Sequence, residues 1–86
     1  MYKIALTKTA EKDYVYLFEH NRPIFERIAK ALRAIASEPH QGKPLKLNLK
    51  GKWSYRVGTY RIIYSIDHNV LMIHVLYIGH RREVYR

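Results

Sequence analysis

Residues 79–86 bring together side chains suited to chemistry on a phosphate group. The segment reads GHRREVYR and contains His80, Arg81, Arg82 and Tyr85. Each guanidinium presents a rigid fork of hydrogen-bond donors that matches a phosphate, and an imidazole or a phenol can move a proton. These residue types at this spacing predict an anion site at which a proton can be transferred.

A second pair of arginines is predicted from the register of an antiparallel hairpin. Gly58-Thr59 suits a two-residue turn between KWSYRV and YRIIYSI, and this turn sets Arg56 directly opposite Arg61. Two like charges facing each other across strands cost up to about 1 kcal/mol unless an anion lies between them. We therefore predict that a phosphate binds between the arginine-rich tail and this sheet face, which also carries Ser54 and Ser65.

The net charge of +9 is concentrated in the second half of the chain. Residues 1–38 carry seven Lys/Arg and five Asp/Glu, whereas residues 39–86 carry nine Lys/Arg against only Asp67 and Glu83. This asymmetry favours a polyanionic partner, and nucleic acid ahead of acidic lipid, because no basic amphipathic helix is present. Further phosphate-binding candidates are the lysines of the connecting segment, Lys46, Lys50 and Lys52.

The composition predicts one folded domain over residues 1–86, with 48% hydrophobic and 27% charged residues. The sequence has no cysteine, no apolar stretch that could span a bilayer and no signal peptide, so we expect a cytoplasmic location without membrane contact. Acidic and histidine residues lack metal-site spacing, so neither a metal nor another cofactor is expected.

The first half of the chain predicts a strand followed by a helical hairpin. Residues 2–7 form the strand, and Thr7 or Thr9 caps the first helix. Pro23 suits the first turn of the second helix, which ends before Pro39. The apolar face expected on the first helix consists of Ala10, Tyr14, Leu17 and Phe18, and that on the second of Phe25, Ile28, Ala29, Leu32, Ile35 and Ala36.

The second half predicts a three-stranded antiparallel meander. A connection with an extended piece at Leu45–Leu49 precedes it, and a two-residue His68-Asn69 turn would add Met72, His74 and Leu76 to the face of the arginines. The fold class is therefore α+β: an N-terminal strand, a two-helix antiparallel hairpin and a three-stranded antiparallel meander, with the helices packed on one face of the sheet. The aromatic residues of the hairpin, among them Trp53, are expected in the core rather than stacked on bases.

The stretches YRVGTYRIIY and GHRREVY resemble the RelE branch of the RelE/ParE superfamily of toxins. The resemblance runs from the opening strand to the tail. It implies a toxin of a type II toxin–antitoxin system, a metal-free endoribonuclease that cleaves mRNA in the ribosomal A site by 2′-OH attack on the scissile phosphate and so inhibits translation. It also implies three partners: mRNA, the ribosome with its rRNA, and a RelB-like antitoxin.

The resemblance also assigns roles to individual residues. Arg61 matches the arginine that holds the scissile phosphate, Arg81 the arginine that supports the leaving group, and Tyr85 the near-terminal tyrosine. Arg56 is a further catalytic candidate for charge stabilisation. The general base and the general acid stay open between Tyr85 and His80, whose imidazole is the side chain best suited to proton transfer near neutral pH.

The strand before the hairpin departs from the family pattern. Some relatives carry two alternate lysines where this chain has Ser54 and Arg56, so one cation is replaced and one is lost, unless Lys50 or Lys52 substitutes. Two alternatives therefore stay open. One is a DNA gyrase poison of the ParE type, and the other is a non-enzymatic RNA-binding domain of the same fold.

Overall fold

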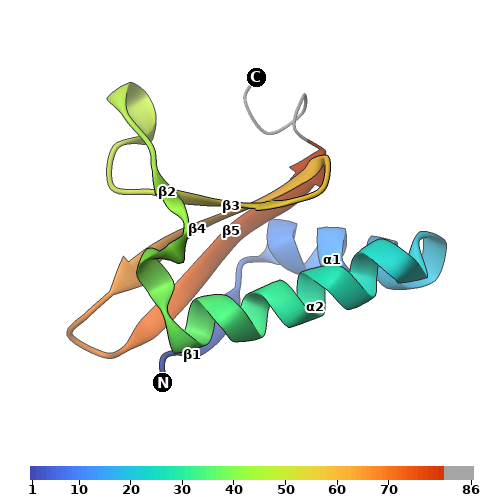
Figure 1. Ribbon diagram of the computed structural model, residues 1–86, viewed down its shortest axis with the longest axis horizontal. Coiled ribbons are helices and arrows are strands. Elements are labelled where there is room, and N and C mark those ends of the chain that lie inside the picture. The colour runs from blue at the N-terminus through green and yellow to red at the C-terminus, as the bar shows by residue number, and fades with distance from the viewer. Residues whose placement is uncertain (81–86) are drawn as a thin grey trace.

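Two helices cover one face of a five-stranded sheet in the computed structural model, which describes residues 1–80 (Figure 1). The strand order is β1-β5-β4-β3-β2, and only β1 and β5 run parallel. This arrangement confirms the α+β fold. The elements are β1 (Lys3–Leu6), α1 (Lys8–His20), α2 (Arg22–Ser37), β2 (Lys43–Pro44), β3 (Trp53–Val57), β4 (Tyr60–Asp67) and β5 (Met72–His80), with 3-10 turns at Pro39–Gln41 and Leu47–Leu49.

The helical hairpin is set by two capping residues. Thr7, rather than Thr9, caps α1: its hydroxyl accepts a hydrogen bond of 3.1 Å from the Ala10 N–H. Asn21 ends α1 and also begins α2, where its side chain accepts a hydrogen bond from the Ile24 N–H. Because one residue joins the helices, they turn back on each other and lie along the same sheet face.

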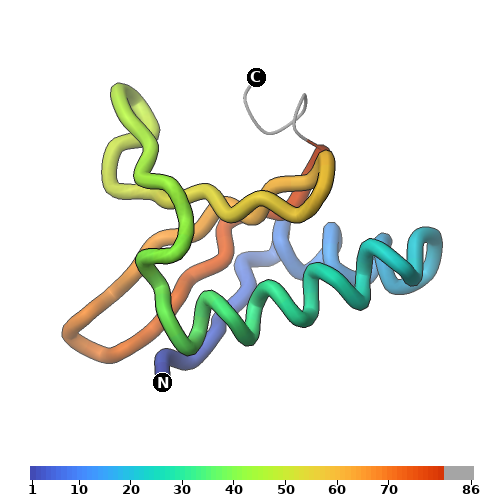
Figure 2. The backbone as a smooth tube through the Cα atoms, viewed as in Figure 1, coloured from blue at the N-terminus to red at the C-terminus, as the bar shows by residue number. Residues whose placement is uncertain are grey.

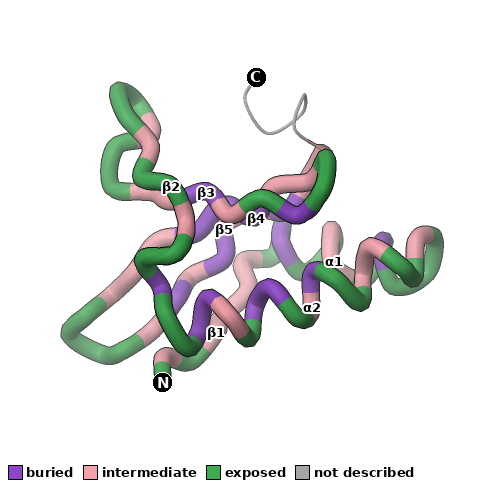
Figure 3. Tube along the Cα trace, in the orientation of Figure 1, coloured by how far each residue is buried: buried purple, intermediate pink, exposed green. Residues whose placement is uncertain are grey.

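The core lies between the helices and the sheet face that they cover, as the buried positions in Figure 3 show. Most residues of the apolar faces predicted for the two helices lie in this core, and Ile28, Leu32 and Ile35 are buried. Phe18 is an exception, since 45% of it is exposed. The sheet contributes Val57, Ile62, Tyr64, Ile73, Val75 and Ile78 to this core.

The predicted register of the first hairpin is confirmed. β3 and β4 pair through Val57 with Tyr60 and through Arg56 with Arg61, so Gly58-Thr59 is the two-residue turn. Gly58 has a φ of 60°, in the left-handed region that favours glycine.

The β4–β5 hairpin differs from the prediction in two ways. Asp67 pairs with Met72, so four residues rather than His68-Asn69 alone connect the strands. The ladder then shifts, because Tyr64 pairs with Val75 while its neighbour Ile63 pairs with Tyr77. Leu76 is therefore the extra residue of a β-bulge, and strict alternation along β5 ends there.

The connection between the helices and the meander is also different from the prediction. Its extended part is β2, at Lys43–Pro44, and Leu47–Leu49 forms a 3-10 turn instead of a strand. Residues 43–52 are here called the lysine loop. They begin in β2, and the residues after Pro44 extend beyond the sheet and away from both helices (Figure 2). Among residues 1–80, no helix is long and apolar enough to cross a membrane.

Tyr64 anchors the start of this connection from inside the core. Its hydroxyl donates a hydrogen bond of 2.6 Å to the Pro39 carbonyl, and burial raises the pKa of Tyr64 to about 12. A side chain at Gly42 would collide with that hydroxyl and would lie 2.9 Å from the Ser54 carbonyl oxygen. The close approach of the backbone to Tyr64 therefore requires glycine at position 42.

Candidate functional site

The candidate site lies on the outer face, defined as the sheet face opposite the helices. Arg56 on β3 pairs with Arg61 on β4, and Arg61 pairs in turn with Gly79 on β5. Paired residues of neighbouring strands share a face, so these three positions form one row across the sheet. Gly79 has no side chain, so the position next to Arg61 in this row, here called the open position, carries no side-chain group.

The two arginines of this row have different environments. Arg61 is half-buried and its Nε atom is buried, so the inner end of the guanidinium lies within the sheet surface. Arg56 is exposed, and its Nε donates a hydrogen bond of 3.2 Å to the Gly58 carbonyl. The predicted pairing of Arg56 with Arg61 is thus confirmed. The Arg61 guanidinium starts from a buried atom, and the Arg56 guanidinium lies over the hairpin turn.

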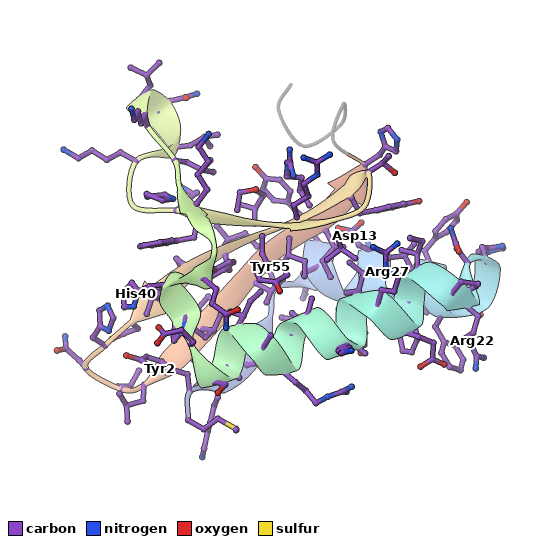
Figure 4. The ribbon with its side chains drawn as sticks, viewed as in Figure 1. Tyr2, Asp13, Arg22, Arg27, His40 and Tyr55 are labelled. Carbon is purple, nitrogen blue, oxygen red and sulfur yellow. The ribbon has the colours of Figure 1, made fainter. Side chains whose placement is uncertain are left out.

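Further cations approach Arg56 from α2. A cavity of about 300 Å³ between α2 and β3 is lined by Arg27, Lys30, Tyr55 and Arg56. Figure 4 shows Tyr55 between the sheet and α2, with Arg27 on that helix. The positive charge therefore continues around the edge of β3 from the outer face to the helices.

A second row of the outer face contains a phenol that the sequence analysis did not identify. Ser54, Ile63 and Tyr77 are paired across β3, β4 and β5. Tyr77 is half-buried and precedes Gly79 by two residues, so it stands beside the open position next to Arg61. Strict alternation would have turned Tyr77 towards the helices, and only the bulge at Leu76 brings it to this face.

The same bulge turns His80 to the sheet face that the helices cover. His80 pairs with Tyr60, whose ring packs against the core, and the two rings meet edge to face at 5.8 Å between centroids. His80 also lines a cavity of about 240 Å³ beside α1, together with Asp13, which accepts a hydrogen bond of 3.0 Å from the Ile78 N–H. The structure therefore places His80 on the sheet face opposite that of Arg56 and Arg61, and its catalytic role stays a prediction.

The remaining predicted residues fall into three groups. Lys46 and Lys50 are exposed on the lysine loop and Lys52 is half-exposed, whereas Ser54 is buried at 6% exposure. His74 lies on the outer face opposite Ser65, and Leu76 occupies the bulge. Arg81, Arg82 and Tyr85 lie outside the described residues. Over residues 1–80, no group of three or more His, Asp or Glu side chains could hold a metal ion.

These contacts define a basic surface with a fixed centre. Residues 39–66 contain six Lys/Arg and no Asp or Glu, and they supply the lysine loop, β3 and most of β4. A guanidinium anchored in the sheet is preorganised for an anion, since little reorganisation is needed when the anion binds. The arrangement suits one phosphate at Arg61, flanked by further phosphates along the lysines.

Three comparisons with known proteins identify relatives of this chain. Residues 4–85 match the family described as the ParE toxin of the type II toxin–antitoxin system parDE. The chain is 35% identical to toxin RelG of Mycobacterium tuberculosis, over 99% of this chain and 97% of that one, and 36% identical to toxin YoeB of Synechocystis, over 83% and 90%. The toxin–antitoxin complex RelBE2 of Mycobacterium tuberculosis contains a similar fold, with a TM-score of 0.80, 33% identity and coverage of 93% and 98%.

Proposed function

This chain belongs to the ParE toxin family of type II toxin–antitoxin systems, with RelE, RelG and YoeB toxins among its relatives, and we propose that it is a ribosome-dependent endoribonuclease. It cleaves mRNA in the ribosomal A site and so stops translation. This activity belongs in the cytoplasm, where the ribosome is found. The observation that carries the proposal is the row formed by Arg56, Arg61 and Gly79 on the outer face.

The proposed reaction is an in-line attack by a ribose 2′-OH on the neighbouring phosphate. The 2′ oxygen bonds to phosphorus, the bond to the 5′ oxygen breaks, and the products are a 2′,3′-cyclic phosphate and a free 5′-OH. Arg61 binds the non-bridging oxygens, on which negative charge increases in the transition state, and Arg56 assists from the opposite strand. The open position at Gly79 gives the phosphate access to Arg61.

Two protons must also move in this reaction. One leaves the 2′-OH and one reaches the departing 5′ oxygen. Tyr77 stands on the outer face beside the open position, and the resemblance to RelE toxins adds Tyr85 and, for the leaving group, Arg81. We assign proton transfer to these phenols rather than to His80, because His80 faces α1.

The partner that restrains such a toxin is proposed to be a RelB-like antitoxin with an acidic and apolar segment. The comparison with the RelBE2 complex supports a protein partner, and residues 39–66, which carry no acid, present the complementary charge. Expression of the toxin with the neighbouring gene should relieve growth arrest and allow both proteins to be purified together. Equal arrest with and without that gene would reject it as the antitoxin.

Primer extension on a translated message tests the proposed activity. Cuts at codon positions that appear only when the message is translated are the expected result. The same cuts in free mRNA would remove the ribosome from the mechanism, and RNA that is bound but uncut would favour a non-enzymatic RNA-binding domain.

A second candidate is a DNA gyrase poison, because the matched family is described as the ParE toxin of parDE. A gyrase poison would not need Arg56 and Arg61 to bind a scissile RNA phosphate. Intact mRNA together with DNA double-strand breaks in arrested cells would favour it over the endoribonuclease.

A further inference from the structure

Leu47 combines two features that a folded chain normally avoids. Its backbone is in the left-handed region, with a φ of 59°, and 90% of the residue is exposed. A leucine with this φ is strained, because Cβ crowds the neighbouring carbonyl, and its exposure means that no packing within the chain offsets that strain. The side chain therefore contributes little to the stability of this fold.

Leu71 is a second leucine in the left-handed region, and it has a contact elsewhere in the fold. Leu71 has a φ of 52°, but it is only 51% exposed, and its carbonyl accepts a hydrogen bond of 2.9 Å from the Lys3 N–H. That bond joins the β4–β5 loop to β1. The backbone of Leu71 is thus held by a contact with β1, whereas the Leu47 carbonyl bonds only to a neighbour within the lysine loop, and its side chain is almost fully exposed.

The conformation of Leu47 is held by hydrogen bonds of the lysine loop. The Lys50 N–H donates to the Leu47 carbonyl at 3.0 Å, and the Leu49 N–H donates to the Lys46 carbonyl at 3.1 Å. At the base of the loop, the Leu45 N–H donates to the Lys52 carbonyl at 2.9 Å. The loop therefore presents its apolar tip in one arrangement before any partner binds.

The surroundings of the tip are basic. Four lysines, Lys43, Lys46, Lys50 and Lys52, lie within ten residues of chain that contain no acidic residue. Figure 3 shows this loop as mostly exposed, at the far end of β3 from the Arg56–Arg61 pair. Because Trp53–Val57 rises about 3.3 Å per residue, the loop lies more than about 10 Å from the phosphate proposed at Arg61.

We propose that the lysine loop is a docking element for folded ribosomal RNA, in which Leu47 makes an apolar contact between lysines bound to phosphates. This inference rests on the proposed function for its partner. It adds a site separate from the cleavage site, with the task of orienting the toxin on the ribosome. Its chemistry is neutralisation of phosphates combined with burial of one aliphatic side chain against ribose or base.

The composition of the loop favours folded RNA over the mRNA strand. Proteins bind single-stranded RNA by stacking its bases on aromatic side chains, and residues 43–52 contain no aromatic residue. A fixed, convex loop suits the wide and shallow minor groove of an RNA helix, which is recognised by shape. The four lysines match the phosphates that border such a groove, whereas a protein surface would need a cluster of acids.

Binding to purified ribosomes tests this role, in an Arg61→Ala background so that mRNA cleavage is slow on the timescale of the measurement. Leu47→Asn keeps the left-handed backbone, which asparagine tolerates, and removes the apolar tip. We expect ribosome affinity to fall about tenfold at fixed salt, with a melting temperature that is unchanged or higher. Leu47→Met should bind within about twofold of the parent, because it preserves apolar volume.

Leu71→Asn is the matched control, since it changes the other strained and exposed leucine away from the lysine loop. It should leave ribosome affinity unchanged. Equal affinity of folded Leu47→Asn and its parent would overturn the inference, and so would an equal loss with Leu71→Asn.

Two further measurements separate the possible partners. If Leu47→Asn lost tenfold affinity for a single-stranded RNA oligonucleotide, the loop would be assigned to mRNA. If Leu47→Asn lost antitoxin binding but kept ribosome binding, the loop would be assigned to a protein partner. Either result overturns the proposal. A parent that binds no ribosomes also overturns it. Primer extension with the wild-type chain is a separate measurement. The absence of cuts in translated mRNA would contradict the proposed function itself, whatever the result for the loop.

Discussion

Arg56 and Arg61 face each other across the β3–β4 ladder, and the same row ends at Gly79. Two guanidiniums so placed repel each other in the free protein, at a cost of up to about 1 kcal/mol. The row therefore stabilises a bound anion more than it stabilises the fold. This relationship separates catalysis from stability in a way that mutation can measure.

Arg61→Ala should abolish most of the activity without unfolding the protein. Loss of one preorganised donor to the transition state typically costs about 10²–10³ in rate. The free energy of unfolding should stay within about 1 kcal/mol of wild type, because relief of repulsion with Arg56 offsets lost packing. Arg61→Lys should restore only part of the rate, since an ammonium lacks the bidentate fork.

The measurements for Arg61 are ribosome-bound mRNA cleavage and a thermal melt on the same preparation. Arg33→Ala, an exposed arginine of α2, is the control and should cleave at the wild-type rate. Wild-type cleavage by folded Arg61→Ala would remove the phosphate site from the mechanism.

Tyr77→Phe tests the phenol that the bulge brings to the outer face. If this hydroxyl transfers a proton, its loss should slow cleavage by about tenfold or more while RNA binding persists. Tyr55→Phe removes a hydroxyl on the opposite sheet face and should leave the rate unchanged. Single-turnover cleavage with excess toxin separates the chemical step from binding, and equal rates for Tyr77→Phe and wild type would exclude Tyr77 from proton transfer.

Gly42→Ala should destabilise the fold through Tyr64. The added methyl group collides with the Tyr64 hydroxyl, and overpacking of this kind typically costs about 1–3 kcal/mol. Tyr64→Phe alone should cost about 1 kcal/mol, because it removes the hydrogen bond to Pro39. Urea unfolding of both single variants and the double variant should reveal coupling of about 1 kcal/mol, since Tyr64→Phe relieves part of the clash. Strict additivity would contradict this contact.

Tyr64 also predicts a loss of stability in alkali. A tyrosine in the unfolded chain has a pKa of about 10. Burial raises the pKa of Tyr64 to about 12 in the folded protein, so the folded state keeps its proton longer. The protonated hydroxyl therefore contributes fully to the free energy of unfolding below pH 10. As the pH rises from 10 to 12, the free energy of unfolding falls by roughly 2 kcal/mol.

The measurement is urea unfolding between pH 8 and pH 12, compared between wild type and Tyr64→Phe. The two proteins differ only in this hydroxyl, so the comparison isolates its contribution. The difference between the two stabilities should therefore shrink with rising pH, and a constant difference would contradict the burial of this hydroxyl.

Local signals made most of the fold predictable. The Gly58-Thr59 turn fixed the pairing of Arg56 with Arg61, because a two-residue turn leaves only one register. Thr7 and Pro23 marked the starts of the helices through capping and a preset φ. These features depend on neighbours in sequence, which the sequence displays directly.

The parts that were missed depend on contacts between distant residues. At the bulge in β5, the Leu76 carbonyl accepts a 2.6 Å hydrogen bond from the Thr7 hydroxyl, 69 residues away in sequence. No local sequence pattern predicts this bulge. It places Tyr77 on the outer face, where strict alternation would have placed His80. The 3-10 turn at Leu47–Leu49 was missed because residues 45–50, LKLNLK, alternate apolar and polar side chains as a strand does.

The parallel pairing of β1 with β5 sets an order of events in folding. Thr7 and Leu76, which meet at this ladder, are 69 residues apart in sequence, whereas the hairpins of β3, β4 and β5 close through short turns. Closing so long a loop carries an entropic cost of about 4 kcal/mol, so the meander can form first and β1 docks late. Until then one edge of β5 is open, and stopped-flow refolding should show that Ile4→Val accelerates unfolding more than it slows folding.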